Sequence, residues 1–163
     1  AGVEMPKVKV VSPHQIPLPY RSLLVHDDDM TLTLERHFGG RLVLRPLSTF
    51  SVGNSYFRRV LLVQEYSGRP VEMGAIRMRL DAFNQRLRGK ILRNKMPLGR
   101  ILRDGQFKYK SQAKAFLSVT PNPEMMGVFW MREPHVLYGR RTEIIRHDVK
   151  IGDIVEVLPM VFR

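Results

Sequence analysis

Glu156 is the residue whose chemistry fits its surroundings least. It lies within Ile154-Val155-Glu156-Val157-Leu158, a strand-like run whose other members are all β-branched residues or leucine. Such runs are typical of central strands that are buried on both faces. An ionised carboxylate in that place must find a cation or take up a proton, so its pKa should rise on burial and fall beside an arginine. The alternative is an edge strand with Glu156 in water, but the apolar neighbours favour a buried acid.

Two arginines, Arg58 and Arg59, stand directly before the apolar run Val60 to Val63. Successive residues of a strand point to opposite faces, so one guanidinium should face each side of a sheet. An arginine at the edge of an apolar cavity presents a rigid fork that matches a carboxylate, whereas a solvated arginine, the more common case, is only part of a charged surface. A buried Glu156 and an arginine on neighbouring strands would together make a site for a small anion.

The elements that would position these residues are strands. Two strand-like runs, Tyr56 to Glu65 and Pro70 to Leu80, flank the turn residues Ser67 and Gly68, a pattern typical of a β-hairpin. This hairpin is the expected spine of a single antiparallel sheet in an α+β fold. Lys7 to Val11 is predicted to be a short strand or an extended arm. Further predicted strands are Arg41 to Val52, with Pro46 at a bulge or edge, Phe107 to Val119, and Met125 to Met131, which is alternatively a gap-filling segment. A second hairpin is predicted from Val136 to His147 and Asp153 to Phe162, joined by a turn around Asp148 to Asp153.

Two helices are predicted before the hairpin. The first is short, from Tyr20 to His26. In the second, Asp28 or Asp29 caps a helix whose apolar positions Met30, Leu34 and Phe38 recur every four residues, and Gly39-Gly40 ends it. The run His26-Asp27-Asp28-Asp29 has the residue types of a metal site, but consecutive acids at a helix start are more often caps, so we expect no metal.

A helical hairpin is predicted between Asp81 and Gly105. Asp81 would cap a helix with the apolar stripe Phe83, Leu87 and Ile91. After Pro97, at the expected first helical position, comes a second helix with Leu98, Ile101 and Leu102 inside, ended by Gly105. Gly89 and Gly99 lower the stability of both helices. The pair could therefore act as a lid over the sheet.

Composition limits the possible classes. A chain of 163 residues with 44% hydrophobic content is expected to form one domain, residues 1–163. It has no apolar run near the roughly 20 residues of a membrane span and no signal-peptide pattern, so we expect a cytoplasmic protein. The absence of cysteine excludes disulfides, thiolate catalysis and cysteine-based metal sites.

The chain is strongly basic, with 27 lysines and arginines against 15 acids and a net charge of +12. Nucleic acid is the usual partner of such a charge. However, the basic residues are interleaved with apolar ones, and zinc-finger, RNP and GXXG motifs are all missing, which makes nucleic acid an unlikely partner. The alternative is a small anion drawn into a positive pocket. Charge alone does not choose between them.

Several motifs occur in the order and spacing of a known family. They are Leu23-Leu24 through Asp29-Met30-Thr31, Arg58 ahead of Leu61-Leu62, Gly74, Pro97-Leu98-Gly99-Arg100, Gly139-Arg140-Arg141, and Glu156 ahead of Leu158-Pro159. From Leu23 to Pro159 the chain resembles the chorismate pyruvate-lyase family. The resemblance implies one antiparallel sheet that carries the site and helix-turn-helix flaps that bury an aromatic acid.

The resemblance also implies roles for individual residues. Arg58 would bind the ring carboxylate beside the backbone amides of Met30 and Leu98, and Glu156 would face the ring hydroxyl as the acid-base group. The catalytic residues would then be Glu156 and Arg58, and Met30, Leu98, Arg58, Gly74 and Arg77 would bind the substrate. The family has an arginine directly after the glycine matched by Gly74, where this chain has Ala75. Arg77, on the same strand face as Ala75, would compensate.

Two functions follow from the resemblance. One is the lyase reaction, which converts chorismate to 4-hydroxybenzoate and pyruvate without a cofactor or a metal, so that positioning and a proton carrier suffice. The other is a domain of the same fold that binds a small anionic aromatic ligand without turnover, as in some bacterial transcription regulators.

Overall fold

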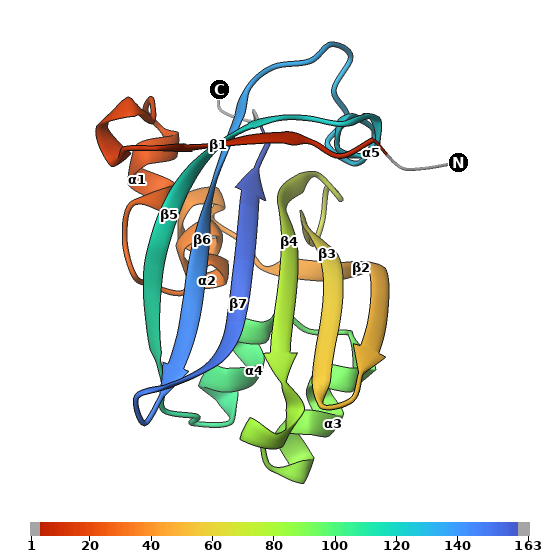
Figure 1. The fold of residues 1–163 in the computed structure, drawn as a ribbon. Coiled ribbons are helices and arrows are strands. Elements are labelled where there is room, and N and C mark those ends of the chain that lie inside the picture. The colour runs from red at the N-terminus through yellow and green to blue at the C-terminus, as the bar shows by residue number, and fades with distance from the viewer. Residues whose placement is uncertain (1–3, 160–163) are drawn as a thin grey trace.

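The computed structural model describes residues 4–159 and contains one seven-stranded antiparallel sheet, in the order β1-β5-β6-β7-β4-β3-β2 (Figure 1). The predicted fold class, a single antiparallel sheet with a few helices, is confirmed. The strands are β1 (Lys7–Val11), β2 (Leu42–Val52), β3 (Ser55–Gln64), β4 (Pro70–Arg79), β5 (Lys110–Thr120), β6 (Leu137–Arg146) and β7 (Val149–Leu158). The helices are α1 (Tyr20–Leu24), α2 (Met30–Phe38), α3 (Gln85–Arg93), α4 (Leu98–Asp104) and α5 (Pro123–Val128), with short 3-10 turns at Pro13–Gln15 and Leu80–Ala82.

The order of the strands places Glu156 at the centre of the sheet. The predicted hairpin is present as β3 and β4, and β6 and β7 form a second hairpin. Strand β7 pairs with β4, so it lies between β4 and β6. Glu156 on β7 is therefore opposite Gly74 on one side and opposite Arg140 on the other. The interpretation of Glu156 as a residue of a central strand is confirmed.

The sheet has apolar cores on both faces. Helices α2 and α4 lie behind the sheet in Figure 1. On that side Val60 and Leu62 pack in one cluster with α1 and α2, and Ile76 packs in a second cluster with α3 and α4. On the opposite face Leu61 and Val157 pack with residues of α5. The alternation along β3 thus sends even-numbered residues, Arg58 among them, toward α1 to α4.

Local signals explain most of the helix boundaries. The Asp29 carboxylate accepts a hydrogen bond from the Thr31 amide and caps α2, and Gly39 ends it with a φ of 72°. The expected bulge in β2 lies between Pro46 and Ser48. The predicted helix ending at Gly105 is also present, although Pro97 is the residue before the first helical position and not the first position itself.

Other boundaries differ from the predictions. Asp81 does not cap α3, because a 3-10 turn occupies Leu80–Ala82 and the Asn84 side chain accepts from the Leu87 amide instead. Met125 to Met131 is not a strand, since Asn122 caps the helix Pro123–Val128.

The turn of the C-terminal hairpin is tighter than expected. It consists of His147 and Asp148, which both have positive φ (51° and 61°), so β7 begins at Val149 and not at Asp153. Positive φ at both central residues is the geometry of a two-residue hairpin turn. The predicted end of this strand, residues 160–162, lies outside the described residues.

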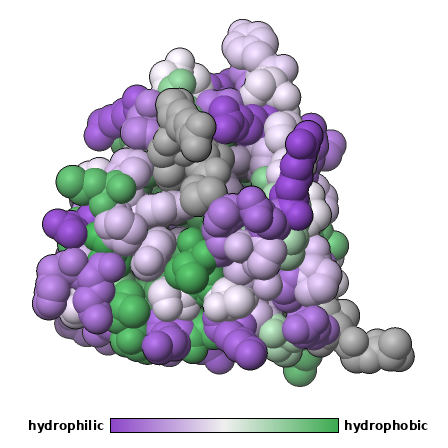
Figure 2. Space-filling model, turned by 90° about the horizontal axis from the view of Figure 1, so that it is seen from above, coloured by the Kyte–Doolittle hydropathy of each residue, from purple (hydrophilic) through white to green (hydrophobic). Residues whose placement is uncertain are grey.

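The face seen from above in Figure 2 is mixed, with small hydrophobic groups separated by hydrophilic residues. This is the pattern of an ordinary protein surface. Within residues 4–159, none of the helices has the length and apolar character needed to cross a membrane.

Candidate functional site

A cavity lies between the sheet and the helices on the α1 to α4 side. Its apolar walls come from strands and from the lid, among them Val60, Leu62, Ile76, Leu98, Leu102 and Ile154. Arg58, Glu72, Arg140 and Glu156 also line it. Its volume is about 60 Å³, well below the roughly 300 Å³ at which small-molecule sites begin. The cavity can hold a few waters, but an aromatic acid enters only if part of the wall moves.

Arg58 is a buried cation without a carboxylate. Only 2% of the residue is exposed. Its Nη1 donates to Asn94 Oδ1 at 3.2 Å, its Nη2 donates to the Met96 carbonyl at 3.3 Å, and its Nε has no partner. Burial lowers the pKa of Arg58 to about 10, against a small opposing effect of Tyr56. The guanidinium is thus charged at neutral pH, and no acid among residues 4–159 pairs with it.

The partners of Arg58 belong to the lid. Asn94 ends α3 in the left-handed conformation, with a φ of 58°, and Met96 lies in the connection to α4. Both acceptors are neutral oxygens, which bind a guanidinium less strongly than the two oxygens of a carboxylate would. The link between α3 and α4 therefore supplies both hydrogen-bond acceptors of the guanidinium.

Glu156 lies across the cavity and is 4% exposed. Arg140 Nη2 is 3.8 Å from its Oε1, while Oε2 has no hydrogen-bond partner. Burial raises the pKa of Glu156, and the positive charge of Arg140 and a hydrogen bond from Glu72 oppose that rise. The expected buried acid beside an arginine is therefore present, and its cation is Arg140 and not Arg58.

Glu72 was not among the predicted site residues. It is 5% exposed, on β4, two residues before Gly74 on the same face. Burial, followed by the charge of Glu156, raises the pKa of Glu72 well above its ordinary range. A side chain at position 74 would have its Cβ 3.7 Å from Glu72 Oε1. Gly74 thus leaves space beneath the two carboxyl groups.

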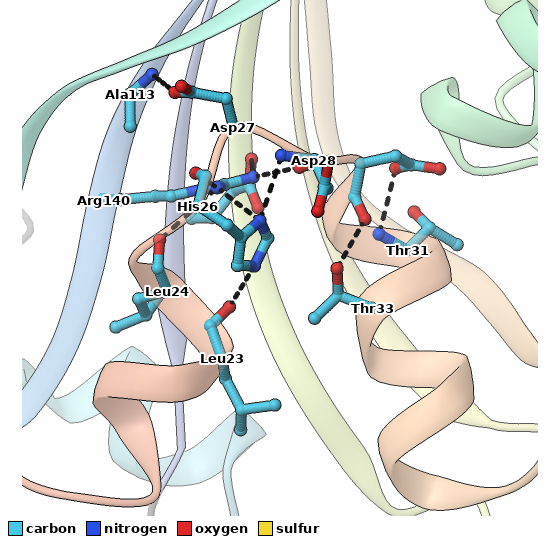
Figure 3. Close-up of polar contacts among 11 residues, drawn as sticks. Leu23, Leu24, His26, Asp27, Asp28, Thr31, Thr33, Ala113 and Arg140 are labelled. Carbon is cyan, nitrogen blue, oxygen red and sulfur yellow. Dashed lines mark hydrogen bonds and ion pairs between the residues drawn. The ribbon is translucent and has the colours of Figure 1, made fainter.

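Arg140 also holds the loop that forms one edge of the cavity (Figure 3). Its Nη1 donates to the carbonyls of Leu24 and His26. Its Nη2 donates to the Asp28 carbonyl at 2.9 Å. The His26 ring bridges the same loop, with Nε2 2.7 Å from the Leu23 carbonyl and Nδ1 accepting from the Asp28 amide. Arg140, on a central strand, therefore fixes the loop that leads into α2.

Met30 and Leu98 both line the cavity and begin α2 and α4. The two helix starts meet at Asp29, whose carboxylate forms an ion pair with Arg103 of α4 at 3.3 Å. A Cβ at Gly99 would overlap that carboxylate. Asp29 and Gly99 are thus a tight contact between the α2 loop and the lid.

Arg77 does not reach the cavity, which corrects the expectation that it helps to bind the same ligand. It shares a strand face with Ala75, as predicted, but that face is the one opposite Glu156. Its Nη2 donates to Asp153 at 2.8 Å. A residue at position 75 also faces away from the site, so Ala75 removes nothing from it.

A wider groove of about 390 Å³ lies on that opposite face. Phe50 and Phe57 stack there with ring centroids 4.6 Å apart. Two of its arginines have acidic partners, Arg59 with Glu124 and Arg77 with Asp153. Arg58 lines both the groove and the smaller cavity, but the buried charged residues Glu72, Arg140 and Glu156 line the cavity alone, so we place the candidate site there.

Within residues 4–159, no group of three or more histidines or acids is arranged to hold a metal ion. In the run that starts at His26, Asp27 accepts from the Ala113 amide and Asp29 caps α2. Asp29 thus has the capping role that the sequence favoured, whereas Asp27 connects the loop to β5.

Comparison with solved structures identifies the fold. The chain is similar to PhnF from Mycobacterium smegmatis, at 12% identity and a TM-score of 0.56 over 83% of this chain, but it spans only 65% of that protein. It is also similar to the ligand-binding domain of a putative GntR-family transcriptional regulator from Bordetella bronchiseptica, at 13% identity and a TM-score of 0.51, over 76% of this chain and 90% of that one. A third likeness is to gene product SA0254 from Staphylococcus aureus, at 7% identity and a TM-score of 0.53, over 72% of this chain and 82% of that one.

By sequence, no protein-family model and no curated protein matches the chain. The structural likenesses are too distant in sequence to show more than the fold. That fold is the chorismate lyase-like fold of the ligand-binding domains of GntR-family regulators.

The contact between Asp29 and Gly99 predicts the effect of a small substitution. In Gly99→Ala the new methyl group displaces the Asp29 carboxylate, which then loses its cap on α2 and its ion pair. We expect the free energy of unfolding in urea to fall by about 1 kcal/mol or more. Gly89→Ala, on α3, is the control, because a Cβ there meets nothing within 4 Å and should be neutral or stabilising. Equal effects of the two changes would show that the contact does not join loop and lid.

Proposed function

We propose that residues 1–163 form one domain that binds a small, carboxylate-bearing aromatic molecule without turnover. The observation that carries the proposal is Arg58, a buried guanidinium that lines the cavity and has no acidic partner among the described residues. Burying an unpaired charge costs several kcal/mol, and a ligand carboxylate would offset that cost. The likeness to the ligand-binding domain of a transcription regulator supports binding rather than catalysis.

The rest of the cavity suits the body of such a ligand. Aliphatic side chains such as Val60, Leu62, Ile76 and Leu102 form part of its wall, which suits a ring between the charged ends of the cavity. Gly74 keeps the floor open, and Met30 and Leu98 lie at the starts of two helices on its rim. In this proposal Arg58 binds the carboxylate, Glu156 and Gly74 lie at the opposite end, and the backbone of Met30 and Leu98 completes the enclosure.

Binding requires the lid to move. The cavity is too small for a ring in the closed state, and the two partners of Arg58 come from the link between α3 and α4. A carboxylate that replaces Asn94 and Met96 at the guanidinium would release this link. Ligand binding and lid position are therefore coupled through Arg58.

A thermal-shift titration with 4-hydroxybenzoate tests the role of Arg58. The wild-type chain should be stabilised by about 2.7 kcal/mol when the ligand is at 100 times its dissociation constant. Arg58→Gln removes the charged fork and should abolish the shift, while the unliganded variant should fold at least as well because a buried unpaired charge is gone.

Arg59→Gln is the matched control, since Arg59 is the next residue but faces the opposite side and pairs with Glu124. It should leave the ligand-induced shift unchanged. A shift that survives in Arg58→Gln, or that disappears equally in both variants, would contradict the assignment of the carboxylate to Arg58.

A second candidate function is the lyase reaction, in which chorismate gives 4-hydroxybenzoate and pyruvate. It is favoured by one specific observation: Glu156, the predicted acid-base residue, is buried in the same cavity as Arg58. Such a group can accept and return the proton that the elimination moves.

Pyruvate release from chorismate decides between the two functions. For a binding domain we expect no pyruvate above the uncatalysed background, together with stabilisation by 4-hydroxybenzoate. If release occurs, Glu156→Gln should lower kcat at least a hundredfold with little change in KM, because it removes the proton carrier and retains the shape. A catalysed release would reject the proposal of binding without turnover.

A further inference from the structure

Two buried carboxyl groups lie side by side on the floor of the cavity. Glu156 is directly opposite Gly74 across the β4–β7 pair, and Glu72 is two residues from Gly74 on the same face of β4. Because Gly74 has no side chain, the carboxyl group of Glu72 reaches over it, within 3.7 Å of where a Cβ would be. Burial and the nearby charge of Glu156 raise the pKa of Glu72, so Glu72 is the member of the pair that keeps a proton more readily.

The positive charge around this pair is enough for one carboxylate. Arg140 on β6 is 3.8 Å from Glu156, but it also serves the loop carbonyls described above. Asp29, at the start of α2, adds negative charge and is paired with Arg103 of α4. Tyr109, ahead of β5, lines the cavity and is neutral at ordinary pH. Two adjacent buried carboxyl groups with one cation cannot both be ionised at low cost.

We propose that Glu72 and Glu156 share a single proton and that the pair recognises a hydroxyl group on the ligand that Arg58 holds by its carboxylate. The recognition half of this inference rests on the proposed function. Glu72 is thereby a specificity-determining residue. The shared proton is a property of the protein alone, and it can be tested without any ligand.

The chemistry of the pair explains why a hydroxyl fits. With one proton between them, the two groups offer one donor and one acceptor, and a hydroxyl is both an acceptor and a donor. An ammonium group has only donors and would require the shared proton to leave. Arg58 on β3 and Glu156 on β7 are separated by β4, which places their backbones about 10 Å apart across the sheet. The ligand class is a ring with a carboxylate at one end and a hydroxyl at the other.

The shared proton predicts how stability depends on pH. A carboxyl group whose pKa is raised by folding stabilises the folded state below its unfolded pKa, and this stabilisation is lost as the pH rises through its folded pKa. The free energy of unfolding of the wild-type chain should therefore fall, relative to that of Glu72→Gln, as the pH rises from about 4.5. Glu65→Gln, an exposed change on the same hairpin, should give a curve parallel to the wild type. If the curve of Glu72→Gln is also parallel, the shared proton is rejected.

Binding of 4-hydroxybenzoate and benzoate, measured by calorimetry against pH, tests the recognition. The wild-type chain should bind 4-hydroxybenzoate at least tenfold more tightly than benzoate. Its affinity for 4-hydroxybenzoate should fall as the pH rises and Glu72 ionises. Glu72→Gln should keep that preference within about threefold and lose the pH dependence, whereas Glu72→Leu should lose the preference. A merely structural role would not change the pH profile. Equal affinity of the wild type for the two acids would overturn the claim that the pair recognises a hydroxyl. Failure to bind either acid would refute that claim and the proposed function together. In that case the pH curves without ligand would still show whether Glu72 and Glu156 share a proton.

Discussion

The site depends on the guanidinium of Arg58, which is buried without a counter-ion among residues 4–159. The side chain of Arg58 lies among apolar residues of the sheet, and its hydrogen bonds go to neutral oxygens of the α3–α4 link. The charge is therefore costly to bury, and the contacts that partly satisfy it join the sheet to the α3–α4 hairpin. The proposed binding of a ligand carboxylate would act on this same contact.

The opposite side of the cavity is organised by a different arginine. Arg140 pairs with Glu156 and anchors the loop before α2, so the acid and one wall of the site are positioned by a single side chain of a central strand. Glu72 adds a second carboxyl group in the space left by Gly74. With Glu72 protonated, Arg140 is the cation beside Glu156 and Arg58 is the cation that a ligand carboxylate would pair with.

The sequence predicted the parts of the site whose signals are local. The hairpin of β3 and β4, the apolar neighbours of Glu156 and the alternation at Arg58 and Arg59 were enough to predict one buried acid and one arginine facing it in a single sheet. The expectation that they lie on neighbouring strands was wrong, because β4 separates β3 from β7. Glu72 had a similar signal, a carboxylate within a strand-like run, but was missed because the run is shorter on its N-terminal side. The prediction that Arg77 binds the ligand was wrong. Spacing along β4 shows which residues share a face, but only the packing of the helices decides which face carries the cavity. The position of Arg140 against Glu156 depends on the pairing of β6 with β7. Its hydrogen bonds to the loop before α2 join residues more than 100 positions apart in the sequence, so no local pattern predicts them.

The most direct test of the account is a crystal structure of the chain with 4-hydroxybenzoate. The account predicts that the carboxylate lies within hydrogen-bond distance of the Arg58 guanidinium, that Asn94 and Met96 have moved away from it, and that the ring hydroxyl faces Glu72 and Glu156. A ligand bound instead in the groove beside Phe50 and Phe57, with Arg58 still bonded to Asn94 and Met96, would contradict it.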